Sequence, residues 1–197
     1  MSDANRPRPA LVLVDFQRGF ESTYWGKRNN PGAETRALDL LAAFRQHSAP
    51  IFHVRHLSLE PGSPLSGAGA TFKPGFEPRA GEALVEKTVN SAFIGTSLEA
   101  GLRRLSVTDI VLCGLTTPHC VSTTTRMAGN LGFTVHLAAD ACAAFTRNAD
   151  CSFDEGAPYT AEEIHRAALS HLHGEFATVA AARDCLSAVF GGTAGAG

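Results

Sequence analysis

Short continuous apolar runs, separated by segments with helical periodicity, are the feature that most constrains the fold of this chain. Strands that are apolar at successive positions are buried on both faces, as in a parallel sheet covered by helices. The clear runs are ALVLVDF (10–16), PIFHVRH (50–56), DIVLCGL (109–115) and FTVHLAAD (133–140), and EFATVAA (175–181) is a weaker one. We therefore expect strands at these positions, paired in a parallel sheet.

Amphipathic segments alternate with these runs. We expect helices at about 33–47, 95–105, 118–131, 160–173 and 180–189. A chain that alternates strands and helices folds into three layers with right-handed crossovers. The predicted fold class is therefore α/β, a three-layer α/β/α domain with a Rossmann-like parallel sheet. Ligand sites in such folds lie outside the carboxyl ends of the strands.

Length and composition fit a single domain over residues 1–197. Hydrophobic residues make up 44% of the chain, charged residues 18%, and the formal net charge is −2, so nothing indicates a nucleic-acid or membrane partner. No apolar run approaches the roughly 18 residues that a membrane span needs, and we expect a cytoplasmic protein. Residues 1–9, which are polar and proline-rich, and the glycine-rich residues 191–197 are expected to be disordered tails.

Cys120 follows the run 109–115 at the expected start of a helix. Thr117 has the side chain of an N-cap, and Pro118 suits the first helical position. A helix start carries partial positive charge, which favours a thiolate, and free N–H groups, which can bind an oxyanion. The alternative is a structural cysteine. His119 is adjacent to Cys120, and we expect it to be a poor direct base because successive helical residues diverge.

Two charged residues end other apolar stretches. Asp15 ends the first run, and a carboxylate after four apolar residues is costly to bury without partners. Lys87 follows the apolar patch in ALVEK (83–87). A thiolate that attacks an amide needs a proton donor for the leaving nitrogen and a base for water. Asp15 can serve as both, although the local sequence also allows a structural carboxylate and a solvated lysine.

Three separated motifs carry a family resemblance. They are LVLVDFQRGF (11–20), VEKTVNSAF (85–93) and GLTTPHCVSTTTRMAGNLGFTVHLAADACAAF (114–145). In this order they resemble the isochorismatase-like cysteine hydrolase superfamily, which includes nicotinamidases, N-carbamoylsarcosine amidohydrolases and biuret or ureide hydrolases. The resemblance spans about residues 10 to 185 and does not distinguish one member from another.

The resemblance implies both a topology and a site. The sheet would have six parallel strands in the order 3-2-1-4-5-6, and the catalytic triad would be Asp15, Lys87 and Cys120. A cis peptide would join Leu115 to Thr116, and the N–H groups of Thr116 and Cys120 would form the oxyanion hole. The implied reaction is hydrolysis of a C–N bond in a small amide, ureide or carbamoyl substrate through a thioester on the cysteine.

The sequence argues against a bound metal ion. Metal-dependent nicotinamidases resembling this chain carry an Asp-x-His pair and a further His after the second strand. Here the Asp of such a pair is missing before His56, because Val54 stands two residues before it. No other histidine follows until His119. His53 and His56 are three residues apart on a strand and so face opposite sides. We expect neither a metal nor another cofactor.

Substrate contacts are expected from side chains beyond the first three strands. Phe20, Trp25, Arg55, His56 and Asn90 are the candidates, although the aromatic residues could equally belong to the core and Asn90 could cap a turn. Tyr24 and Ser91 are weaker candidates of the same kind. The segment from residue 57 to 81 is rich in glycine, proline and serine, and it is either a lid, with Phe72 near the pocket, or a surface excursion.

Other functions remain open from sequence. An isochorismatase-type vinyl-ether hydrolase is one alternative, although relatives of that branch can lack the cysteine. A redox-sensing thiol protein is another, and it would require a second cysteine such as Cys142 or Cys151 to approach Cys120. A non-catalytic assembly module is the third. We expect a small-molecule substrate and, from the apolar segment 121–145 together with the resemblance, a homodimer or homotetramer.

Overall fold

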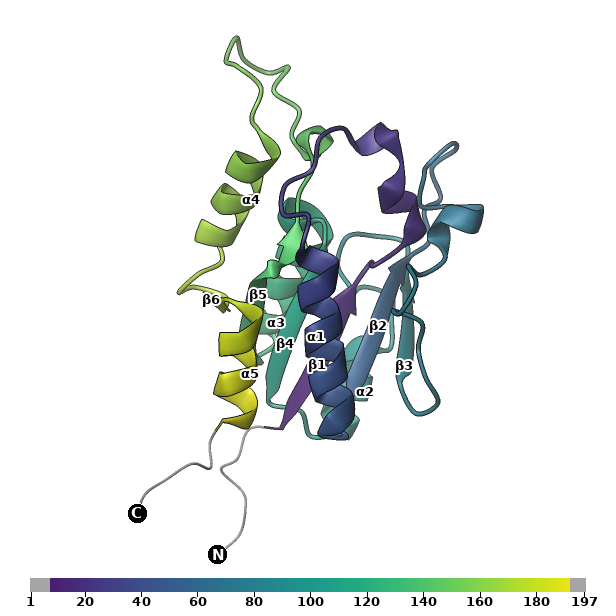
Figure 1. The fold of residues 1–197 in the computed structure, drawn as a ribbon, viewed down its shortest axis with the longest axis vertical. Helices are drawn as coiled ribbons and strands as arrows, with labels where there is room; N and C mark the ends of the chain where they lie inside the picture. Colours follow the sequence, from purple (N-terminus) through teal and green to yellow (C-terminus); the bar gives the residue numbers. More distant parts are fainter. Residues whose placement is uncertain (1–7, 192–197) are drawn as a thin grey trace, which may run out of the picture.

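A single six-stranded sheet organises the computed structural model, which describes residues 8–191 (Figure 1). The strand order is β3-β2-β1-β4-β5-β6, and every neighbouring pair is parallel. The strands are β1 (Pro9–Val14), β2 (Ile51–His56), β3 (Ala83–Lys87), β4 (Asp109–Leu115), β5 (Thr134–Ala143) and β6 (Thr178–Ala180). The predicted fold class and strand order are confirmed.

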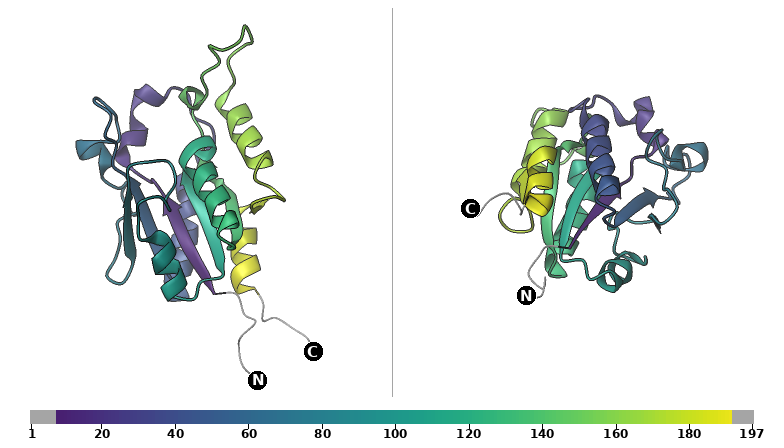
Figure 2. Two further views of the ribbon diagram at one scale, coloured as in Figure 1. Left: turned by 180° about the vertical axis from the view of Figure 1, so that it is seen from behind. Right: turned by 60° about the horizontal axis from the view of Figure 1, so that its bottom comes forward.

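Helices cover both faces of this sheet (Figures 1 and 2). α1 (Ala33–Gln46) and α5 (Ala182–Phe190) pack together on one face. α2 (Leu98–Arg104) and α3 (Ser122–Asn130) lie on the other. α4 (Ala161–Ser170) packs against the turn that precedes α3. These five helices agree with the five predicted segments, each somewhat shorter than expected.

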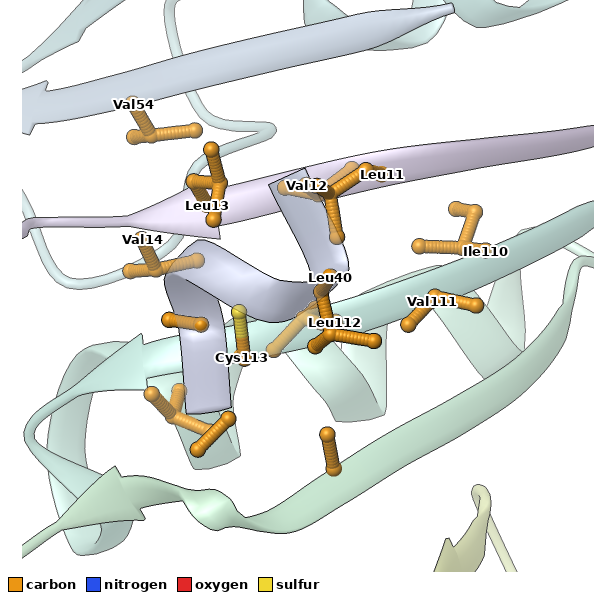
Figure 3. Close-up of a cluster of buried hydrophobic side chains, with 14 of the residues drawn as sticks. Leu11, Val12, Leu13, Val14, Leu40, Val54, Ile110, Val111, Leu112 and Cys113 are labelled. Carbon is orange, nitrogen blue, oxygen red and sulfur yellow. The ribbon is translucent and has the colours of Figure 1, made fainter. Parts of the chain in front are cut away.

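The core lies around the two central strands, β1 and β4. Four consecutive residues of β1, Leu11 to Val14, are buried and pack between Val54 of β2 and the β4 residues Ile110 to Cys113 (Figure 3). Leu40 of α1 covers this cluster from one face. Because both faces of β1 are buried, its sequence is apolar at successive positions.

Edge strands are less visible in the sequence. β3 alternates between buried and exposed residues, so it does not give a continuous apolar run; the sequence offers only the short apolar patch before Lys87, and the family resemblance supplies the sixth strand. The weak run 175–181 yields just the three-residue strand β6. Strands with one solvated face, or with little pairing, need fewer apolar side chains.

The predicted tail boundaries require a correction. Pro9 begins β1, and Gly191 forms the C-cap of α5, so neither belongs to a disordered tail. Residues 1–7 and 192–197 of the predicted tails lie outside the described residues. Within residues 8–191, the helices are all too short or too polar to cross a membrane.

The segment from 57 to 81 contains one short 3₁₀ helix, Gly67–Ala70. Its second half packs onto the domain: Phe76 stacks on Phe16 with ring centroids 4.2 Å apart, and Phe72 pairs with Gln17 through a backbone bridge. Both phenylalanine side chains are buried.

Candidate active site

Asp15, Lys87 and Cys120 meet at the carboxyl edge of the sheet. Asp15 directly follows β1, Lys87 ends β3, and Cys120 lies in the turn after β4. Lys87 Nζ donates hydrogen bonds to Asp15 Oδ2 at 2.7 Å and to Cys120 Sγ at 3.2 Å. Exposed fractions are 0% for Asp15, 2% for Lys87 and 7% for Cys120. The structure therefore brings the three predicted side chains into one buried cluster.

Backbone conformation places Asp15. Its φ of 55° lies in the left-handed region, which Asp and Asn tolerate better than most residues. The chain turns there out of β1, while the Asp15 N–H still donates to Val54 O at 2.9 Å. An aspartate at this position thus suits the turn as well as the ion pair with Lys87.

A glycine allows β4 to approach β1 closely just before the turn. Gly114 has φ 148°, and a Cβ at this position would lie 2.1 Å from Val14 O and 2.7 Å from Val14 Cβ. Any larger residue would therefore push β4 away from β1. The close approach brings the turn that carries Cys120 next to Asp15.

Residues Thr117–Val121 form one π-helical turn that leads into α3. Such turns are rare in proteins as a whole, but those that occur are often at functional sites. The predicted N-cap at Thr117 is wrong, because Thr116 precedes the turn and contributes no side-chain cap. Thr117 Oγ1 instead shares a 2.8 Å hydrogen bond with His165 Nδ1 of α4. The Leu115–Thr116 peptide bond is cis.

His56 completes the surroundings of Lys87, with His56 Nδ1 3.1 Å from Lys87 Nζ. Ligand atoms of Asp15, His56 and Cys120 lie within 4.8 Å of one another, a spacing that could hold a metal ion. However, the Lys87 ammonium is within hydrogen-bond distance of all three side chains. A cation in this cluster would therefore compete with the lysine.

The charge states follow from burial and from these contacts. Burial alone would lower the pKa of Lys87, but Asp15 and Cys120 more than offset it, and the pKa lies above its usual value. Burial, followed by the Lys87 charge, lowers the pKa of His56. At neutral pH Lys87 is therefore an ammonium, and the neutral His56 can accept its proton in a hydrogen bond.

The surroundings of Cys120 oppose the thiolate that a helix start by itself would favour. Burial raises the pKa of Cys120, the Asp15 carboxylate raises it further, and Lys87 only partly opposes them. The resting nucleophile is therefore a thiol. Any deprotonation must accompany its reaction, and it requires a base close to Sγ.

Asp15 offers such a base. Its Oδ2 accepts from Lys87, whereas its Oδ1 is buried and has no hydrogen-bond partner among the described residues. A buried carboxylate oxygen without a partner is unusual in a folded protein. It leaves one lone-pair site of the carboxylate open, and a carboxylate oxygen of Asp15 lies within 4.8 Å of Cys120 Sγ.

A cavity of about 420 Å³ opens onto Cys120. Four of the five predicted substrate-binding residues line it: Phe20, Trp25, His56 and Asn90. The Cys120 thiol donates weakly to Asn90 Oδ1 at 3.6 Å. The volume is within the range of small-molecule sites.

Arg55 does not line this cavity, and its prediction as a substrate-binding residue is wrong. Successive side chains of a strand alternate between faces, so Arg55 points away from the side that His56 occupies. It pairs with Glu86 and lies over the Phe72 ring at 5.9 Å. Tyr24, Phe72 and Ser91 are also outside the lining, and Ser91 Oγ instead contacts Met127 Sδ.

Residues 58–65 supply one wall of the cavity, including Ser58, Glu60 and Ser63. The sequence left open whether this segment is a lid or a surface excursion, and it named only Phe72 as near the pocket, which the cavity lining does not include. Gln17 was missed entirely. It is fully buried, and its amide bonds both the N–H and the C=O of His56, at 2.7 and 2.8 Å, and the C=O of Ala70 at 3.0 Å. A glutamine two residues after the carboxylate that ends a buried strand was the available signal.

The cysteines are all unpaired. Among the described residues Cys120 is the one cysteine that lines the cavity. Its neighbour His119 is also part of the lining. Cys142 is buried in β5, where burial raises its pKa to about 12. Cys151 borders a separate depression beside Tyr24 and Arg147. Neither cysteine forms a disulfide with Cys120.

Comparison with known proteins agrees with this fold. The isochorismatase domain model matches residues 9–184. YrdC, an isochorismatase family protein of Bacillus subtilis, is 42% identical over 175 residues, which cover 87% of this chain and 91% of that protein. A crystal structure of an isochorismatase-family protein from Chromobacterium violaceum is 41% identical, with a TM-score of 0.85 and 95% of each chain covered. Nicotinamidase 3 of Arabidopsis thaliana is 29% identical over 190 residues, which cover 89% of this chain and 85% of that protein.

The match of the domain model extends over all six strands and over the residues that form the site. Both the topology and the motifs at residues 11–20, 85–93 and 114–145 fit this assignment. The chain therefore belongs to the isochorismatase family of hydrolases.

Proposed function

We propose that this protein is a cysteine-dependent hydrolase that cleaves the C–N bond of a small amide, ureide or carbamoyl substrate. One observation carries the proposal: the Cys120 thiol faces a small-molecule cavity beside a buried aspartate that has one unpartnered oxygen, Asp15 Oδ1. A nucleophile next to a held base is the arrangement that covalent catalysis needs. A relative that is named a nicotinamidase supports amide hydrolysis.

The first half-reaction forms a thioester. Asp15 Oδ1 takes the thiol proton as Cys120 Sγ bonds to the substrate carbonyl carbon, and the carbonyl oxygen becomes an oxyanion. The oxyanion would be bound by the N–H groups of Thr116 and Cys120. Among residues 8–191 the Thr116 N–H has no acceptor, so it is available to a ligand. Asp15 then gives its proton to the leaving nitrogen as the C–N bond breaks.

The second half-reaction releases the acid. Asp15, again a carboxylate, takes a proton from water as the hydroxide oxygen bonds to the thioester carbon. The C–S bond then breaks, and the proton returns to the sulfur. Lys87 remains an ammonium throughout and balances the charge of whichever partner is ionised. No step requires a metal ion or another cofactor.

A vinyl-ether hydrolase is the alternative activity in this family. Vinyl-ether cleavage requires an acid that protonates carbon but no sulfur nucleophile. The location of Cys120 between Lys87 and the cavity therefore favours C–N hydrolysis.

The experiment is ammonia release from a panel of small amides and ureides, including nicotinamide, biuret, N-carbamoylsarcosine and simple carboxamides. Wild type and Cys120→Ala are assayed side by side with a chelator present. The proposal predicts release that survives the chelator and disappears in the variant. Release that persists in Cys120→Ala would contradict it.

A further inference from the structure

Glu60 dominates the charge of the cavity that leads to Cys120. It is the one carboxylate among the lining residues, and no lysine or arginine lines the cavity. Burial lowers the pKa of both histidines of the lining, His56 and His119, so both are neutral at neutral pH. Behind the lining, the charges of Asp15 and Lys87 compensate each other at 2.7 Å.

Two arginines of the same half of the molecule do not line this cavity and contact other groups. Arg55 pairs with Glu86 on the opposite face of β2. Arg147 lies over the Tyr24 ring at 4.1 Å and borders a different depression. Within residues 8–191 the Glu60 carboxylate forms no ion pair of its own. The negative charge of Glu60 therefore acts on whatever enters the cavity.

Two aromatic side chains of the lining add to the attraction that Glu60 exerts on cations. Phe20 and Trp25 both line the cavity, with ring centroids 4.9 Å apart. Trp25 Nε1 donates to Gly19 O at 2.9 Å, which fixes the orientation of the indole. Aromatic faces attract cations, and the exposed Glu60 carboxylate at the cavity lining attracts cations and repels anions through a solvent-screened interaction. Glu60 and the two rings thus both favour a positively charged ligand.

We infer that the cavity selects its ligands by charge, with Glu60 as the determinant: it admits neutral amides, prefers those that carry an ammonium group, and excludes carboxylates. The description of these ligands as substrates rests on the proposed function. The charge preference itself is a property of the cavity, and it can be measured without any hydrolysis.

The test uses three methanethiosulfonate reagents of similar size that carry an ethyltrimethylammonium, a propyl or an ethylsulfonate group. In each reaction Cys120 Sγ forms a mixed disulfide, methanesulfinate leaves, and the thiol proton passes to solvent. The protein is the full chain with Cys151→Ser, because the other three cysteines are buried. Peptide mass spectrometry follows modification at Cys120, and rates are normalised to a small neutral thiol.

The expected normalised rate for the ammonium reagent exceeds that for the sulfonate about tenfold. Glu60→Gln should bring the two rates close together, and Glu60→Lys should invert their order. Glu99→Gln on α2 makes the same change in net charge away from the cavity and should leave the ratio unchanged. Glu60 and Glu99 are both on the surface, so these variants should fold.

Three results would overturn the inference. They are equal normalised rates in wild type, a ratio that does not respond to Glu60→Gln, and no modification of Cys120 by any reagent, since the cavity would then be closed to solutes of this size. Hydrolysis is scored separately, with 4-aminobutanamide, pentanamide and succinamate as cationic, neutral and anionic amides. A charge preference at Cys120 without release of ammonia from any amide would contradict the proposed function alone.

Discussion

Lys87 Nζ lies 2.7 Å from Asp15 Oδ2, and neither side chain of this pair is exposed to solvent. The strand order explains the contact: β3 and β1 flank β2, and the long lysine side chain crosses the end of β2 to reach the carboxylate. A buried ion pair contributes little net stability, but removal of one partner leaves an uncompensated charge. The charges of Asp15 and Lys87 therefore affect both the stability of this edge of the sheet and the candidate active site.

Removal of the lysine charge should destabilise the protein. We expect Lys87→Met to lower the free energy of unfolding by about 3–5 kcal/mol, because Asp15 would be left buried and unpaired. Asp15→Asn combined with Lys87→Met should recover much of this loss. Urea unfolding midpoints at neutral pH measure both effects. Equal midpoints for wild type and Lys87→Met would show that the pair is not coupled to folding.

Asp15→Asn should change the reactivity of Cys120 in two opposite directions. The carboxylate raises the pKa of Cys120 and Lys87 lowers it, so the variant should hold more thiolate at neutral pH. Alkylation of Cys120 by iodoacetamide should then be faster than in wild type, while amide hydrolysis should fall by at least about 10³-fold because the general base is lost. Slower alkylation in the variant would mean that Asp15 is not the group that keeps the thiol protonated.

Gly114→Ala should disturb the site through the backbone. A Cβ at this position would meet Val14 O at 2.1 Å, so β4 must move away from β1, and we expect a loss of about 2 kcal/mol or more. Gly32→Ala is the matched control, since nothing lies within 4 Å of a Cβ there, and its effect should stay within about 0.5 kcal/mol. Thermal unfolding of both variants checks the difference. Similar losses would contradict the steric explanation.

Acid stability should depend on Glu34. Burial opposes ionisation of this carboxyl group, but hydrogen bonds and charge from Arg28 and Lys73 outweigh it and lower its pKa to about 2. A depressed pKa contributes stability above the usual carboxyl value of about 4.5, and that stability is lost as the pH falls towards 2. Glu34→Gln should therefore be less stable at pH 7 and should lose less stability between pH 4.5 and 2. Parallel pH profiles of the two proteins would exclude this role.

Sequence reasoning was most successful where burial is two-sided. The central strands β1 and β4 are apolar at successive positions because helices cover both faces, and the sequence shows this directly. Asp15 and Cys120 stand out as polar or reactive residues at the ends of these strands. Lys87 ends a strand that alternates between buried and exposed residues, so only the family resemblance connected it to the other two.

Side-chain direction and loop packing were less predictable. Arg55 and His56 are neighbours in the sequence, yet the strand turns one away from the cavity and the other into it. Thr117 has the side chain of an N-cap but bonds His165, which is 48 residues further along the chain. The protonation of Cys120 depends on burial and on Asp15, and not on the helix start alone. Strand alternation separates Arg55 from His56 but does not say which of them faces the cavity, and the other two outcomes depend on tertiary contacts that local sequence does not encode.

The account depends most directly on a covalent bond between Cys120 and the acyl part of the substrate. The decisive measurement is intact-protein and peptide mass spectrometry after acid quenching during turnover, with the amide that releases ammonia fastest. We predict a mass increase equal to the acyl group on the peptide that contains Cys120, and no increase in Cys120→Ala. Turnover at the wild-type rate in Cys120→Ala, or an acyl group on another residue, would contradict the central claim.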